Sequence, residues 1–355
     1  MSPTTRRLAR LTLAAALLAA IAPVTHAAIA AVPAAATPAA VAVADASGTM
    51  PDGLTSPIAD DAAHALWLGD FDRLEALYRS VRASTELVDG GISRLQWMRV
   101  GLARVFNEDN ATDPYFAQLE ALTHQWSVEH PQSPLAQLLY AQGLRARAWS
   151  FRGDGYASTV TPAAMKEFRR YIALEREHLE KNAALLKGES TADLYLISIG
   201  RIEGMSLPDQ RALALDALAR NPADAQAFVE LATGSLPKWG GSPEQFDAVA
   251  REAARRLRPG TGMAMYAALY DDNLGDFNGE LFEASEADWP LMRQGFRDWM
   301  AHWPSRYMLN RFARVACHAQ DKETTRAVLD QIGDKPMDRA WGNQFETCRR
   351  WARSP

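Results

Sequence analysis

The chain has 355 residues, of which 48% are hydrophobic and 23% are charged, and its formal net charge is −5. This composition is typical of a folded chain with a sizeable core and excludes a largely disordered one. The mildly acidic balance argues against a large surface for nucleic acid or anionic lipid.

The first 27 residues are typical of a signal peptide. Arg6, Arg7 and Arg10 give a positive start, residues 8–22 form an apolar run rich in Leu and Ala, and a small-x-small triplet ends at Ala27. The alternative, an uncleaved anchor, would need about 20 apolar residues. The run is shorter than that, so we expect cleavage and a periplasmic or secreted location. No later stretch predicts a membrane span.

Residues 28–57 are mostly Ala, Val, Pro and Thr, with few large side chains. Such a segment cannot bury enough apolar area to offset the entropy lost on ordering. We therefore expect a disordered linker between the signal peptide, residues 1–27, and one folded domain, residues 58–355.

The folded part is predicted to be all-α, because apolar residues recur at intervals of three and four from Ile58 onward. A helix is expected from Pro162 to about Leu186. Thr161 is its expected N-cap, and Gly188 is its expected stop.

The helices are expected to pair as hairpins. Residues 65–77 resemble a tetratricopeptide unit, in which Gly69 ends the first helix and Phe71 packs between the two. The capping box at 242–245 predicts a further helix that ends near Leu257. The prolines at expected junctions are Pro131, Pro222, Pro259 and Pro304. Their spacing is irregular beside a repeat of about 34 residues, so we expect a degenerate tetratricopeptide-like stack, an α-solenoid.

Two segments carry a resemblance to a known family. Residues 147–157, Arg-Ala-Trp-Ser-Phe-Arg-Gly-Asp-Gly-Tyr-Ala, and residues 236–242, Leu-Pro-Lys-Trp-Gly-Gly-Ser, resemble the uncharacterised bacterial family called domain of unknown function four-zero-three-four. The resemblance implies a helical, tetratricopeptide-like fold and assigns no catalytic residue.

The same two segments contain the candidate binding residues. Trp149, Arg152 and Tyr156 place an arginine and two aromatic rings at a predicted turn, and Lys238 and Trp239 place a lysine and one aromatic ring at another. Such groups could contact a peptide or a carboxylate. The alternative is that they serve packing and turn geometry only.

No pattern predicts a catalytic group, a metal site or a cofactor. His124 and His130 lie six residues apart, which puts them on different helix faces. Asp271 and Asp272 begin an acidic turn whose spacing does not match a calcium loop, so a solvated turn is expected. The tryptophans expected in the core from their helical spacing are Trp67, Trp97, Trp126 and Trp299.

The expected function follows from the expected fold. Stacked helical repeats commonly present a surface to a protein or peptide, so we predict a binding module of the cell envelope with such a partner and no nucleic acid. An envelope hydrolase with an active site that the sequence does not reveal is the alternative.

Cys317 and Cys348 are the two cysteines of the chain. Both fall on the apolar side of predicted helices, and the helix between them would fold the chain back. An even, minimal count in an exported chain favours a disulfide over two free thiols.

Overall fold

The computed structural model describes residues 50–355, apart from 51, 53–54, 108–111, 154–156 and 278–279. The predicted signal peptide and most of the predicted linker lie outside the described residues. Near the end of that linker, the backbone carbonyl of Asp52 accepts a hydrogen bond from the Tyr307 N–H at 3.1 Å, and its carboxylate lies 3.2 Å from Arg306. The described end of the linker therefore packs on the folded domain.

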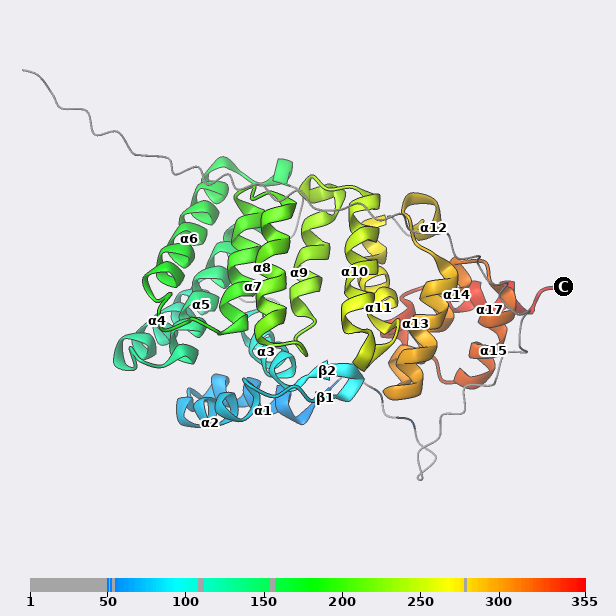
Figure 1. Cartoon of the computed structure of the whole chain (residues 1–355), viewed down its shortest axis with the longest axis horizontal. Helices are drawn as coiled ribbons and strands as arrows, with labels where there is room; N and C mark the ends of the chain where they lie inside the picture. The colour runs from blue at the N-terminus through cyan, green and yellow to red at the C-terminus, as the bar shows by residue number, and fades with distance from the viewer. Residues whose placement is uncertain (1–49, 51, 53–54, 108–111, 154–156, 278–279) are drawn as a thin grey trace, which may run out of the picture. The chain divides into compact units, whose positions relative to one another are not determined.

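Helices account for most of the described residues, as predicted (Figure 1). In chain order the helices are α1 (Pro57–Leu68), α2 (Phe71–Val81), α3 (Arg94–Phe106), α4 (Asp113–Glu129), α5 (Pro134–Arg152), α6 (Pro162–Lys181), α7 (Ser190–Ile202), α8 (Leu207–Arg220), α9 (Gln226–Ser235), α10 (Pro243–Thr261), α11 (Ala264–Asp272), α12 (Leu281–Ala284), α13 (Trp289–His302), α14 (Arg306–His318), α15 (Lys322–Ile332), α16 (Asp338–Trp341) and α17 (Phe345–Arg353).

Side-chain caps explain where many of these helices begin. The N-cap oxygens of Ser133, Thr161, Ser206 and Asp288 each accept the backbone N–H three residues on, and a proline lies in the first turn that follows. Gly69 ends α1 in the left-handed conformation, with φ of 68°. The expected turn between the first two helices is confirmed.

Some predicted boundaries differ. Helix α6 ends at Lys181 rather than near Leu186, because the side-chain amide of Asn182 donates to the His178 carbonyl and the chain then turns. Helix α10 continues to Thr261, past its expected end at Leu257. The last part of the chain forms two helices, α16 and α17, which are separated by a turn at Gly342, whose φ is 57°.

Neighbours in sequence are mostly neighbours in space. Helices α4 to α6, α7 to α11, and α14 with α15 pack each on the next, and α1 also packs on α3 and α11 on α13. Figure 1 shows α7, α8, α9 and α10 side by side in chain order. An all-α stack is therefore established, whereas its degenerate tetratricopeptide-like, solenoid character remains a prediction.

The core divides into two clusters of buried apolar side chains. One cluster draws on α1 to α7 and the other on α7 to α17, so that α7 contributes to both. Trp97 and Trp126 are buried as expected. Trp67 is not, because 63% of its surface remains exposed on α1, so its predicted place in the core was wrong.

A small antiparallel hairpin was not predicted. Strand β1 (Leu87–Val88) pairs with β2 (Ile92–Ser93), and Gly90 and Gly91 in the turn have φ values of 71° and 73°. The Trp299 indole N–H donates to the Gly90 carbonyl at 2.9 Å. A β-carbon on Gly91 would lie only 2.6 Å from the Trp303 ring. The hairpin therefore contacts the end of α13, which is distant from it in sequence.

The predicted disulfide is present. Cys317 on α14 is bonded to Cys348 on α17, with their Cα atoms 5.8 Å apart. None of the described helices is sufficiently long and apolar to cross a membrane.

Candidate functional site

The hairpin closes one side of a cavity of about 510 Å³, which we call the apolar cavity. Its other walls come from the start of α9, the end of α10, α11 and the end of α13. The side chains that define it include Ile92, Val229, Leu257, Met265, Ala268, Trp299 and Trp303. Its volume is in the range of cavities that bind small molecules or single large side chains.

Asp272, at the end of α11, places a carboxylate on the wall of this cavity. Solvent reaches its side chain, and it makes no hydrogen bond or ion pair with any described residue. Surrounding protein raises its pKa from 3.8 to about 6, and the neighbouring charge of Asp271 adds to the rise, while Arg311 opposes it. The other charged side chain on the wall, Arg256, is bonded to Glu252 at 2.9 Å.

The expected solvated acidic turn is therefore wrong for Asp271, whereas Asp272 is exposed as expected. Asp271 is buried, and its carboxylate accepts from Arg311 Nε at 2.5 Å. Asp272, the next residue, lines the cavity instead. Helix α11 turns consecutive side chains about 100° apart, so one aspartate meets α14 and the other meets the cavity.

The raised pKa of Asp272 leads to a prediction about stability. Well below pH 4 the carboxyl is protonated in both the folded and the unfolded chain, so it does not lower the free energy of unfolding there. Between about pH 4 and pH 6 the unfolded chain loses this proton while the folded chain still holds it, so stability falls across that window and stays lower above it. We expect the Asp272→Asn variant to melt at a higher temperature than the natural chain at pH 7.5, with a difference that shrinks towards pH 4.

Thermal melts followed by circular dichroism across this pH range would measure the difference. Asp216→Asn, on the exposed face of α8, controls for the loss of one negative charge. A gain in melting temperature that is the same at every pH would contradict a raised pKa for Asp272.

A second cavity, of about 240 Å³, adjoins the first, and we call it the polar cavity. It lies among α3, α5, α7 and α9. Gln96 and Gln226 line both cavities, so they form part of the boundary between them. Its polar lining also includes Arg99, Gln142, Arg145, Tyr195 and Glu230.

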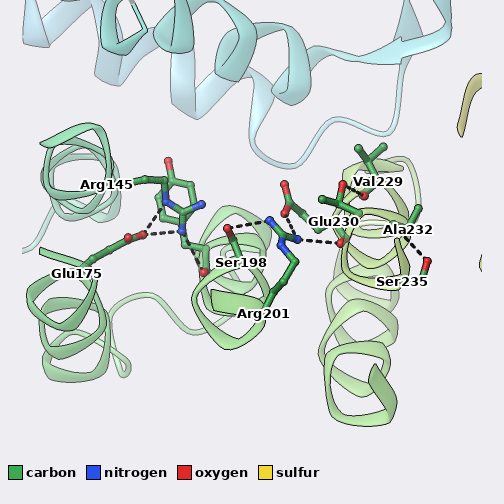
Figure 2. Close-up of polar contacts among 10 residues, drawn as sticks. Arg145, Glu175, Ser198, Arg201, Val229, Glu230, Ala232 and Ser235 are labelled. Atoms are coloured by element: carbon green, nitrogen blue, oxygen red, sulfur yellow. Dashed lines mark hydrogen bonds and ion pairs between the residues drawn. The ribbon is translucent and has the colours of Figure 1, made fainter. Parts of the chain in front are cut away.

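Two ion pairs border the polar cavity through Arg145 and Glu230, and Figure 2 shows both pairs. Arg145 on α5 donates from Nε and Nη2 to one oxygen of Glu175 on α6, at 2.9 and 2.6 Å. Arg201 on α7 donates to the Glu230 carboxylate on α9 at 3.0 Å. Burial raises the pKa of Glu175, although Arg145 opposes the rise. These pairs tie α5 to α6 and α7 to α9.

Arg99 on α3 is less completely paired. Its Nη2 donates to the Asp224 carboxylate at 2.5 Å, whereas its buried Nε and Nη1 find no partner among the described residues. The buried Oε1 of Gln96, one turn earlier on α3, also has none. Unpaired buried groups of this kind cost free energy, and the cost is larger for a charged group.

The residues that the sequence singled out lie elsewhere. Arg152 lies over the Trp149 ring, 5.0 Å from its centroid, and Lys238 pairs with Asp276 at 2.5 Å. Arg152 and Trp239 do line one cavity together, of about 450 Å³, beside Ala157. Tyr156 lies outside the described residues. The structure thus brings Arg152 and Trp239 together in one cavity lining and places Trp149 against Arg152, whereas Lys238 is not among the lining residues.

Comparison with protein-family models, with curated proteins and with solved structures finds no match for this chain. The resemblance to the uncharacterised bacterial family therefore gains no support. The case for a function rests on the two adjoining cavities.

Proposed function

We propose that this chain is an exported binding protein whose apolar cavity accepts an apolar residue of a peptide or protein partner. The observation that carries the proposal is the apolar cavity itself, about 510 Å³ and bounded by two tryptophans. Aromatic side chains that line a pocket are frequent anchors in protein recognition.

The groups beside the cavity suit a peptide better than a hydrocarbon. The side-chain amides of Gln96 and Gln226 lie on its boundary, and amides can both donate to and accept from a peptide backbone. Asp272 would disfavour an anion inside the apolar cavity and would tolerate a neutral or cationic group. A peptide with an apolar anchor satisfies both conditions.

Binding is favoured over the alternative, hydrolysis, by the composition of the cavity wall. Asp272 is the one acidic side chain among the described residues that line it, and no histidine or cysteine accompanies it there. A hydrolase commonly needs a second group, either a base beside a nucleophile or a paired acid. Asp272 is accessible but has no such companion within the described cavity.

Export is supported by the N-terminal pattern together with the bond between Cys317 and Cys348. Disulfides of this kind persist in oxidising compartments such as the periplasm or the exterior of the cell. A periplasmic or secreted location is therefore part of the proposal.

Selection from a random peptide library against the full chain would test the proposed function. We expect the selected peptides to share an apolar residue at one position and to bind in solution by calorimetry. A selection that yields no shared apolar residue, or no binding in solution, would contradict a peptide-binding role.

A further inference from the structure

We propose that the partner is bound through its C-terminus, with the last side chain in the apolar cavity and the terminal carboxylate at Arg99 in the polar cavity. This inference rests on the proposed function and names the chemical class of the partner: a peptide or protein with a free, apolar C-terminal residue.

The donors for the carboxylate are already in place. Arg99 has two buried N–H groups without an acceptor among the described residues, and its side chain is only 12% exposed. Asp224 satisfies a single nitrogen of this guanidinium. A carboxylate is a group that an arginine with free donors binds strongly, through charge-assisted hydrogen bonds.

The other charged side chains that line the polar cavity, Arg145 and Glu230, each pair with an oppositely charged residue. Glu230 is held by Arg201, and the nearest oxygen of Glu175 by Arg145. The one carboxylate among the described residues that line the polar cavity, Glu230, is therefore neutralised in place. Arg99 is the lining cation with the most unused donors among the described residues.

A second unpaired polar atom beside the cavities favours a peptide over other ligands that carry a carboxylate. Gln96 Oε1 is buried without a donor and belongs to the side chain that borders both cavities. The C-terminal residue of a peptide carries a backbone N–H beside its carboxylate, and that N–H is the donor Gln96 lacks. A fatty acid has an apolar chain and a carboxylate but no such N–H.

The spacing of Gln96 and Arg99 also suits a single C-terminal residue of a peptide. Gln96 and Arg99 are three residues apart on α3, which separates them by about 4.5 Å along the helix axis. In a C-terminal residue the carboxylate, the N–H and the side chain all leave one Cα atom. A ligand whose anion and apolar group diverge from one carbon therefore offers one group each for Arg99, Gln96 and the apolar cavity.

The test compares matched peptides on the full chain. Acetylated peptides that end in Leu, Val or Phe, with the preceding positions randomised, are prepared as free acids and as C-terminal amides. By calorimetry we expect the free acids to bind at least tenfold more tightly than the amides. Equal affinity of acid and amide would overturn the inference but leave the proposed function standing, whereas failure of both to bind would overturn the two together.

Variants test whether Arg99 causes the preference for free-acid peptides over amides. The Arg99→Gln variant should reduce the acid–amide difference to less than twofold, and Arg99→Lys should restore part of it. Arg104→Gln, on the same helix but exposed and paired with Asp60, is the matched control and should retain the full difference. If Arg99→Gln does not fold, the comparison of acid and amide on the natural chain still decides the matter.

A fatty acid probe tests the role of the backbone N–H. Octanoate should bind at least tenfold more weakly than the free-acid peptides, because it leaves Gln96 Oε1 without a donor. Octanoate that binds as tightly as the peptides would contradict the assignment of a peptide C-terminus.

Discussion

The Glu175→Ala variant should lose about 3–5 kcal/mol of unfolding free energy, because it leaves the Arg145 guanidinium as an uncompensated buried charge. Glu175 is fully buried, and only 14% of the Arg145 side chain is exposed. Alanine supplies neither the negative charge nor the two hydrogen bonds that Arg145 makes to this carboxylate. Urea denaturation followed by circular dichroism would measure the loss.

Two controls separate the buried charge from a general effect on α6. Glu167→Ala removes an exposed carboxylate that pairs with Arg170 on the same helix, and it should cost less than about 1 kcal/mol. Replacing Glu175 and Arg145 together by leucine should recover much of the loss, since no unpaired charge then remains. Similar losses for Glu175→Ala and Glu167→Ala would show that the buried pair has no special role.

Removing the disulfide should also have a large effect. The bond closes a loop between residues 31 apart in sequence, and the chain-entropy model gives about 3–4 kcal/mol for a loop of this length. We expect the Cys317→Ser, Cys348→Ser double variant to unfold at correspondingly lower urea, with α15 to α17 losing hydrogen-exchange protection first. These helices end the stack and have neighbours on one side only.

Reductant provides the control for this prediction. In the presence of dithiothreitol the natural chain should unfold at nearly the same urea concentration as the double variant. A natural chain that keeps its full stability after its thiols are shown to be reduced would argue against the bond as a structural staple.

Local patterns in the sequence predicted much of the fold. The caps at Thr161 and Ser242, the turn at Gly69 and the pairing of Cys317 with Cys348 each depend on short spacings or on which helix face is apolar. Such features depend on nearby residues or on the apolar periodicity of single helices, so they can be predicted from the sequence alone.

The candidate site could not be predicted in the same way. Arg99 and Glu230 line one cavity although 131 positions separate them along the chain, and neither belongs to a motif. Asp271 and Asp272 are alike in sequence, yet one pairs with Arg311 and the other lines a cavity. Only the tertiary packing of α11 distinguishes them. One signal was available, since Asp89-Gly90-Gly91 is a sequence typical of a tight turn.

The measurement that tests the central claim most directly is the affinity of the selected peptides for a chain whose apolar cavity has been filled. Ala268 lines the cavity, and the Ala268→Trp variant would place an indole within it. Ala121→Trp makes the same substitution on the exposed face of α4, away from both cavities. If the cavity is the binding site, Ala268→Trp should weaken binding at least tenfold by calorimetry while Ala121→Trp leaves it unchanged, provided that both variants melt cooperatively. Equal affinity for the natural chain and a folded Ala268→Trp variant would contradict the claim.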